Sequence, residues 1–193
     1  MTLNFHKMSF NSSKKDWKSY CETTFHSLKA NLHNWGKPEF IRPITRIYYI
    51  GVFDCGTPNQ TPYISEQALN STILGRKTVV DHCLSPQFIS RMVLDNPDKY
   101  LCDLDTFREV FWYSCRTIVV TAEENRMLSA LTKHRGNKYT VDVPTNMKYN
   151  HLNIKLFARE NLQTNWRYAK PADTNILEVP QELLEYEKQF LVE

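Results

Sequence analysis

Two short runs of β-branched residues, each ending in polar side chains, constrain the fold of this chain more than any other feature. The runs occupy residues 78–80 and 117–120. Their composition is typical of buried strands. The first run ends in Asp81-His82, which places a carboxylate and an imidazole on adjacent residues, and the second leads within a few positions to Asn125. We therefore interpret the two strand ends as halves of one site.

The segment after Asn125 favours a helix, and it carries His134 nine positions further along. The two strands are separated by residues 84–115, so an insertion must bring their ends together. Residues 87–94 place apolar side chains on one helical face, and Asn96-Pro97-Asp98 predicts a turn. Asp105 is suited to cap a second helix, whose inward side chains are expected to be Phe107, Val110, Phe111 and Ser114.

Length and composition indicate a globular chain. Its 193 residues suit a single domain with a buried core. The net charge of +3 permits a nucleic-acid partner without requiring one. We expect no membrane association, because no apolar run reaches the length of a membrane span and the N-terminus is unlike a signal peptide. The odd number of cysteines, with no C-x-x-C pair, favours reduced thiols in a cytoplasmic protein and argues against a structural zinc site; they are Cys21, Cys55, Cys83, Cys102 and Cys115.

Residues 1–75 predict a mixture of helix and strand. Residues 1–12 are expected to form a loose arm, and Ser12 or Ser13 to cap the helix that follows. Apolar residues at three- and four-residue steps form one stripe on this helix, which Gly36 and Pro38 should end; they are Trp17, Cys21, Phe25, Leu28, Leu32 and Trp35. Residues 44–53 have the composition of a strand and residues 54–62 that of a loop. Ser65 should cap a short helix that ends at Gly75.

The C-terminal third combines basic and aromatic residues. Gly136-Asn137 indicates a helix end or a hairpin turn, residues 139–143 alternate as a strand does, and residues 181–191 predict an amphipathic helix. Cations and aromatic rings alternate between Arg159 and Lys170, a pattern that suits nucleic-acid contact and equally suits a packed surface extension.

The order strand, strand, helix, with Asp81-His82 on the first strand, Asn125 at the turn and His134 on the helix, resembles the ββα-metal nucleases of the HNH family. The resemblance covers about a third of the chain. It implies an α+β fold, in which a two-stranded antiparallel hairpin plus a helix forms the ββα-metal core of a mostly helical single domain. Residues 1–75 would then precede a core at 76–143 that contains the helical insertion 84–115, and residues 144–193 would extend it.

The resemblance also assigns roles to the site residues. His82 would act as the general base that activates water, because a neutral imidazole suits that role at cellular pH. Asp81 and His134 would hold Mg²⁺ or Mn²⁺, whose open positions waters and phosphate oxygens would fill. Asn125 would orient His82 by hydrogen bonds. The implied activity is metal-dependent hydrolysis of DNA phosphodiester bonds.

Double-stranded DNA is the implied partner. Basic residues flank both halves of the motif, and we consider five of them as phosphate contacts: Arg76, Lys77, Lys133, Arg135 and Lys138. For Arg76 and Lys77, a solvated strand end is an equal alternative. One metal site implies one cut, so double-strand cleavage requires a homodimer or two sequential events. As a small stand-alone chain, the protein resembles the HNH enzymes that bacteriophages and mobile elements carry. This resemblance implies homing or attack on competing DNA in the host cytoplasm.

Two other classes of protein stay open at this stage. A non-catalytic nucleic-acid-binding protein would keep the HNH-like fold and use the basic C-terminal half. A metal-free structural protein would use Asp81 and His134 as a buried pair. Divalent-metal-dependent nicking of a plasmid separates the nuclease from both alternatives.

Overall fold

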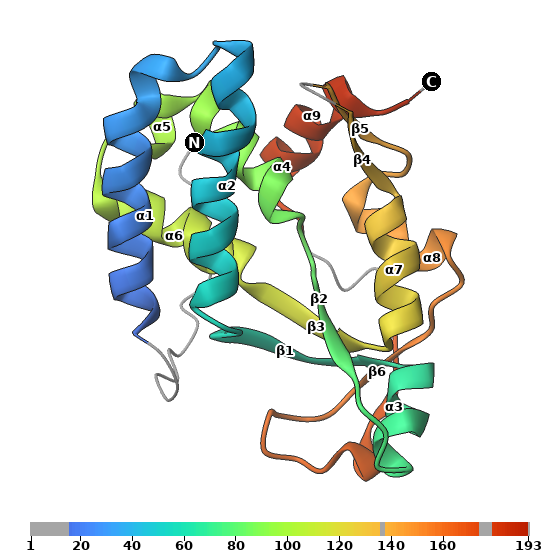
Figure 1. Cartoon of the computed structure of the whole chain (residues 1–193). Coiled ribbons are helices and arrows are strands. Elements are labelled where there is room, and N and C mark those ends of the chain that lie inside the picture. Colours follow the sequence, from blue (N-terminus) through green and yellow to red (C-terminus); the bar gives the residue numbers. More distant parts are fainter. Residues whose placement is uncertain (1–15, 136–137, 174–178, 193) are drawn as a thin grey trace. The chain divides into compact units, whose positions relative to one another are not determined.

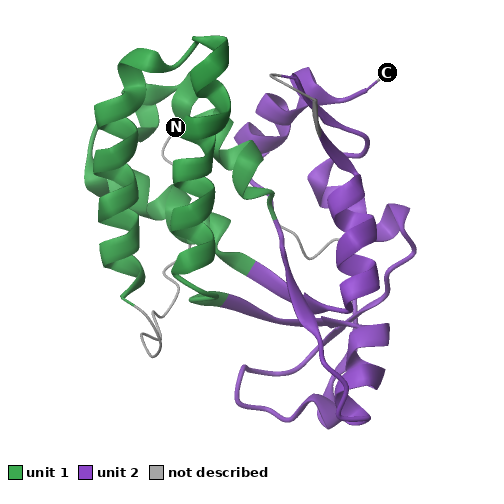
Figure 2. Ribbon diagram, in the orientation of Figure 1, with its two compact units in different colours: residues 1–59, 84–116 green, residues 60–83, 117–193 purple. Residues whose placement is uncertain are grey.

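The computed structural model of the chain describes residues 16–135, 138–173 and 179–192. The predicted arm at residues 1–12 lies outside these ranges. The chain forms two compact units, one from residues 1–59 and 84–116 and the other from residues 60–83 and 117–193 (Figure 2). Within the described ranges, no helix combines the length and the hydropathy that spanning a membrane requires.

The first unit is helical. Its long helices are packed in pairs, α1 against α2 and α6, and α2 against α4 (Figure 1). The predicted insertion therefore folds together with the N-terminal helices. The elements of this unit are α1 (Trp17–Asn31), η1 (Leu32–Asn34), α2 (Pro38–Asp54), α4 (Pro86–Asp95), α5 (Pro97–Tyr100) and α6 (Leu104–Ser114).

The apolar stripe predicted for this helix is confirmed for Trp17, Cys21, Phe25 and Leu28, which are buried, but α1 ends at Asn31 and leaves Leu32 and Trp35 outside it. The cap differs from the prediction. Asp16 is the N-cap of α1, and its carboxylate accepts a hydrogen bond from the backbone N–H of Ser19. The expected caps Ser12 and Ser13 lie outside the described residues.

The strand predicted for residues 44–53 is wrong, because this segment belongs to α2. Pro38, which was expected to stop a helix, occupies the first turn of α2, where its missing N–H costs nothing. Burial explains the difference. The inward residues recur with the period of a helix and pack against α1 and α4, which overrides the strand preference of β-branched and aromatic side chains; they are Ile44, Thr45, Tyr48, Gly51 and Val52.

Gly51 allows α1 and α2 to approach closely. A Cβ atom added at Gly51 would lie 2.1 Å from Thr24 Oγ1 and 3.2 Å from Thr24 Cβ. Gly51→Ala should therefore lower the free energy of unfolding by about 1–3 kcal/mol, because overpacking outweighs the higher helix propensity of Ala. Urea unfolding followed by circular dichroism measures this change. In a Thr24→Ala background the same substitution should be tolerated, and equal losses in both backgrounds would contradict the assigned contact.

The predicted insertion is confirmed as helical. The expected inward side chains Phe107, Val110, Phe111 and Ser114 are buried in α6. The cap is Asp103 instead of Asp105, since the Asp103 carboxylate accepts from the backbone N–H of Thr106 at 2.8 Å. Hydrogen bonds from Thr106 and Cys102 to the Asp103 carboxylate lower its pKa to about 2. The turn expected at residues 96–98 is wrong beyond Asn96, because Pro97 and Asp98 form the first turn of the short helix α5.

The second unit is built on a five-stranded sheet with the strand order β2-β3-β1-β6-β7. The first residues of β1 and β3 belong to the first unit. The sheet strands are β1 (Asn59–Ser65), β2 (Val79–His82), β3 (Arg116–Val120), β6 (Leu156–Ala158) and β7 (Lys170–Ala172). The helices of this unit are α3 (Glu66–Ile73), η2 (Thr145–Met147), α8 (Lys148–His151), η3 (Trp166–Tyr168), α9 (Gln181–Glu187) and η5 (Lys188–Phe190), together with α7 (Ala122–Ala130).

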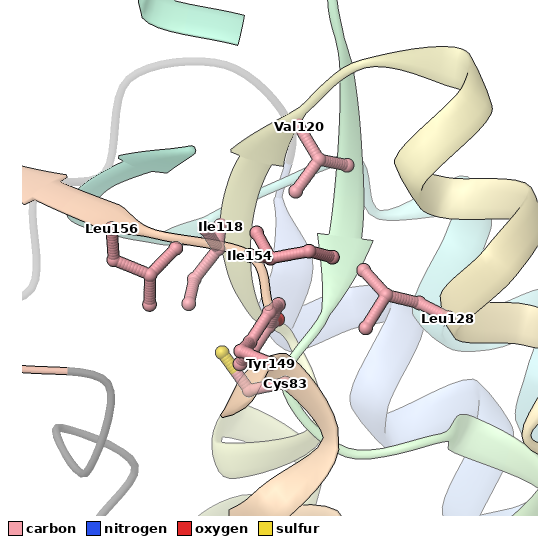
Figure 3. Close-up of a cluster of buried hydrophobic side chains, with 7 residues drawn as sticks. All are labelled: Cys83, Ile118, Val120, Leu128, Tyr149, Ile154 and Leu156. Atoms are coloured by element: carbon pink, nitrogen blue, oxygen red, sulfur yellow. The ribbon is translucent and has the colours of Figure 1, made fainter. Parts of the chain in front are cut away.

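The two predicted site strands pair as expected. β2 and β3 run antiparallel, with Asp81 opposite Ile118 and His82 opposite Thr117. One face of the sheet packs a cluster of buried side chains that includes Ile118 and Leu128 of α7 (Figure 3). Val119, which points to the other face, belongs to a second cluster beside α3. The fold is thus of the α+β class, and the predicted Ser65 cap of α3 is confirmed.

The helix predicted to carry His134 ends earlier. α7 stops at Ala130, and His134 lies in strand β4 (Thr132–Arg135), which pairs antiparallel with β5 (Lys138–Val141). The backbone N–H and C=O groups of β4 are satisfied by hydrogen bonds to β5, so they do not need the hydrogen bonds of a longer α7. The expectation of a helical His134 is therefore wrong. The predicted turn at Gly136-Asn137 lies outside the described residues.

Candidate functional site

Asp81 and His82 lie at the end of β2 and point to opposite faces of the sheet, because successive strand side chains alternate. Both are buried, with exposed fractions of 7% for Asp81 and 9% for His82. Ile118, directly opposite Asp81, belongs to the cluster of Figure 3. Asp81 is thus directed toward α7 and α8.

The carboxylate of Asp81 is held by two neighbouring residues at the start of α8. Lys148 Nζ lies 2.6 Å from Asp81 Oδ2, and the Tyr149 hydroxyl donates to the same oxygen at 2.5 Å. Lys148 also donates to the backbone carbonyl of His82 at 2.7 Å. One ammonium group therefore ties both residues of the Asp81-His82 pair to α8.

A second acid lies near Lys148. Burial raises the pKa of Glu187, while hydrogen bonds from Thr145 and the charge of Lys148 oppose this shift. The backbone N–H of Thr145 donates to Glu187 Oε2 at 2.9 Å, and the Thr145 hydroxyl donates to Oε1. Lys148 thus supplies positive charge to two buried carboxylates, which makes it the electrostatic centre of this part of the unit.

Asn125 lies in the first turn of α7, and its backbone N–H donates to the carbonyl of Thr121 at 2.9 Å. α7 follows β3 directly and packs against β2. The structure therefore brings the helix that carries Asn125 to the strand that carries Asp81 and His82, in the order that the sequence predicts.

The position of Asn125 depends on the adjacent carboxylate of Glu124, which is 2% exposed. Glu124 Oε2 accepts from the Ser65 hydroxyl at 2.5 Å and from the backbone N–H of Thr121 at 2.8 Å. Ser65 caps α3 and Thr121 caps α7, so one carboxylate connects the N-termini of two helices. The positive ends of both helix dipoles favour its charge.

Glu124→Ala should lower the free energy of unfolding by about 2–4 kcal/mol, because it leaves buried donors without an acceptor and removes the capping box of α7. Thermal or urea unfolding measures the change. Glu123→Ala is the matched control, since Glu123 is an exposed acid in the same helical turn. Equal stabilities of the two variants would show that the network around Glu124 is not an anchor of α7.

The candidate phosphate contacts differ in their surroundings. Arg76 and Lys77 are exposed immediately before β2, and Lys138 is exposed at the start of β5. Lys133 forms an ion pair with Asp142 at 2.6 Å, so an intramolecular partner already holds its charge. In the antiparallel register of β4 and β5, the backbone of Arg135 lies opposite that of Lys138. The side chains of His134 and Arg135 lie outside what the structure describes.

The residues around Asp81 do not fit a divalent cation in this arrangement. Lys148 and Tyr149 both direct hydrogen-bond donors at one carboxylate oxygen, where a metal would require open lone pairs. Within the described side chains, no group of three or more His, Cys, Asp or Glu residues is placed to hold a metal ion.

Sequence reasoning missed Lys148 and Tyr149 as partners of Asp81. They lie more than sixty positions further along the chain, and α8 is a four-residue helix with no distinctive pattern. The available signals were the charge of Lys148 and the aromatic ring of Tyr149, but neither indicated a contact with Asp81. The chain matches no family model, and neither a curated protein nor a solved structure matches it significantly.

Proposed function

We propose that this protein is a DNA endonuclease in which His82 acts as the general base. The observation that carries the proposal is the arrangement of β2, β3 and α7. Two antiparallel strands are followed at once by a helix that packs on the first strand, although residues 84–115 separate the strands in the sequence. Asp81-His82 lies at the end of β2, and Asn125 lies in the first turn of α7.

His82 would take the proton from the attacking water. A neutral imidazole has a free ring nitrogen that can accept a proton from water. The backbone carbonyl of His82 accepts a hydrogen bond from Lys148, which ties this end of β2 to α8. Asn125 is anchored by its backbone in the first turn of α7, on the helix that covers the Asp81 face of β2, so its contact with His82 stays a prediction from the resemblance.

The resemblance implies Mg²⁺ or Mn²⁺, which when bound would supply Lewis-acid activation of the phosphate. Lys148 forms an ion pair with the Asp81 carboxylate, so no step of the mechanism is assigned to a metal ion bound to Asp81. The metal requirement is therefore a property for experiment to measure.

A second candidate is a non-catalytic nucleic-acid-binding protein. Two observations favour it, namely the burial of His82 and the engagement of Asp81 by Lys148 and Tyr149. In this case Asp81-His82 would stabilise the fold, and exposed basic residues such as Arg76 and Lys138 would contact phosphates.

Supercoiled-plasmid cleavage distinguishes the two candidates. The full chain is incubated with plasmid in Mg²⁺, in Mn²⁺ and in EDTA, and nicked and linear products are separated by electrophoresis. The endonuclease proposal expects nicked plasmid, with linear product only after two cuts. Salt-sensitive binding without cleavage in any of these conditions would instead support the non-catalytic candidate.

A further inference from the structure

The connection between β6 and β7 has properties that the proposed catalytic residues do not explain. It spans residues 159–169 and leaves the sheet where β6 ends; in Figure 1 it is the orange segment that follows β6. β7 is the last strand of the sheet order, so the connection lies at a sheet edge.

Hydrogen bonds within the connection hold it in a defined conformation. Asn161 Oδ1 accepts from the backbone N–H groups of Gln163 at 2.9 Å and Thr164 at 3.0 Å. Asn165 caps the short helix η3, since its Oδ1 accepts from the backbone N–H of Arg167 at 3.0 Å. The side chains on η3 are therefore presented from an ordered backbone, which reduces the entropy lost on binding.

Trp166 anchors this segment to the protein. Its indole packs against the buried cluster that contains Ile64 and Leu69. The guanidinium of Arg159 lies 3.9 Å from the centre of the indole ring, a cation–π contact. Burial lowers the pKa of Arg159, which agrees with its position against the ring. Trp166 and Arg159 thus support the segment from within.

Tyr168 has the opposite orientation. Its exposed fraction is 74%, the highest among the large hydrophobic side chains in the described part of the chain. Arg167 and Lys170 beside it are also exposed. Residues 161–172 contain no acidic residue, so Arg167 and Lys170 are the charged residues closest to Tyr168 in the chain. An exposed aromatic ring between cations, on an ordered turn, is the combination that binds a base and its phosphates.

We infer that Tyr168, Arg167 and Lys170 form a binding site for single-stranded nucleic acid. The ring of Tyr168 stacks on the face of one unpaired base, and the two cations contact the neighbouring phosphates. A paired base cannot offer its face, because its neighbours in the duplex cover both sides. The site therefore prefers an unpaired strand over a duplex. This inference rests on the proposal that nucleic acid is the partner, but it does not require cleavage.

Fluorescence anisotropy of a labelled oligothymidylate, measured in EDTA to prevent cleavage, tests the inference. The full chain should bind this strand more tightly than a duplex of equal length. Tyr168→Ala and Tyr168→Leu should each weaken strand binding roughly 10- to 100-fold, whereas Tyr168→Phe, which keeps the ring, should retain it. Replacing Arg167 and Lys170 by Gln should reduce the salt slope by roughly one contact each and leave the strand preference in place.

Three outcomes would overturn the inference. These are strand affinity in Tyr168→Ala equal to that of the unchanged chain, equal or tighter binding of the duplex, and the absence of binding to either nucleic acid. The result is separable from the proposed function. Plasmid nicking without an effect of Tyr168 would refute this site alone, and a Tyr168-dependent strand preference without nicking would refute the nuclease alone.

Discussion

His82→Ala should lower the rate of plasmid nicking by a factor of roughly 10²–10⁴, the usual contribution of a general base. DNA affinity should stay close to that of the unchanged chain, because the imidazole acts on water and does not hold the phosphate backbone. Initial rates of nicking at saturating protein, together with anisotropy on uncleaved DNA in EDTA, measure the two quantities separately.

The matched control for this prediction is His151→Ala. His151 is an exposed histidine at the end of α8 in the same unit, and its removal should leave the nicking rate unchanged. Because His82 is buried, circular dichroism and thermal unfolding must show that His82→Ala still folds, and His82→Gln offers a polar replacement of smaller volume change. Nicking by folded His82→Ala at the original rate would show that His82 is not the base.

Lys148→Met should lower the free energy of unfolding by about 3–5 kcal/mol, because it leaves the buried carboxylate of Asp81 without its cation. The side chain of Lys148 is only 12% exposed, so water cannot replace the lost ammonium group effectively. The variant also removes the donor to the His82 carbonyl and the positive charge near Glu187. Urea unfolding at neutral pH measures the loss.

Lys133→Met is the matched control. Lys133 and Asp142 form an ion pair with the same 2.6 Å separation, but the Lys133 side chain is 50% exposed. Its loss should cost no more than about 1 kcal/mol. Adding Asp81→Asn to Lys148→Met should recover part of the stability, since no buried charge is then left unpaired. Equal losses for Lys148→Met and Lys133→Met would contradict the role of Lys148 as a buried counter-ion.

Local patterns in the sequence were sufficient for several elements that short-range chemistry decides, although the caps of α1 and α6 differ from the predicted ones. The β-branched runs predicted β2 and β3, and their antiparallel pairing is confirmed. Ser65 caps α3 as expected, and the inward face of α6 is the predicted one. A cap, a strand run and a helical stripe each depend on neighbours within a few residues, so the sequence alone contains the information.

The candidate site was predicted in part. Asp81 and His82 lie at a strand end as expected, whereas Asn125, expected at the turn before the helix, lies inside α7, which packs against β2. His134, nine positions after Asn125, does not lie on the same helix. α7 ends at Ala130, and the chain then forms β4, which pairs with β5. Spacing along a chain implies a shared helix only while that helix continues, and where it ends depends on distant backbone partners.

Sequence alone therefore determined the strands β2 and β3, the Ser65 cap and the inward face of α6, since each depends on residues close together in the chain. Only the tertiary structure decided that residues 44–53 form a helix, because packing against α1 and α4 outweighs their strand propensity. It alone placed Lys148 on Asp81 and distinguished the packed Trp166 from the exposed Tyr168. Ion pairs and burial are set by which segments meet in space, and residues with the same composition acquire different roles through that contact.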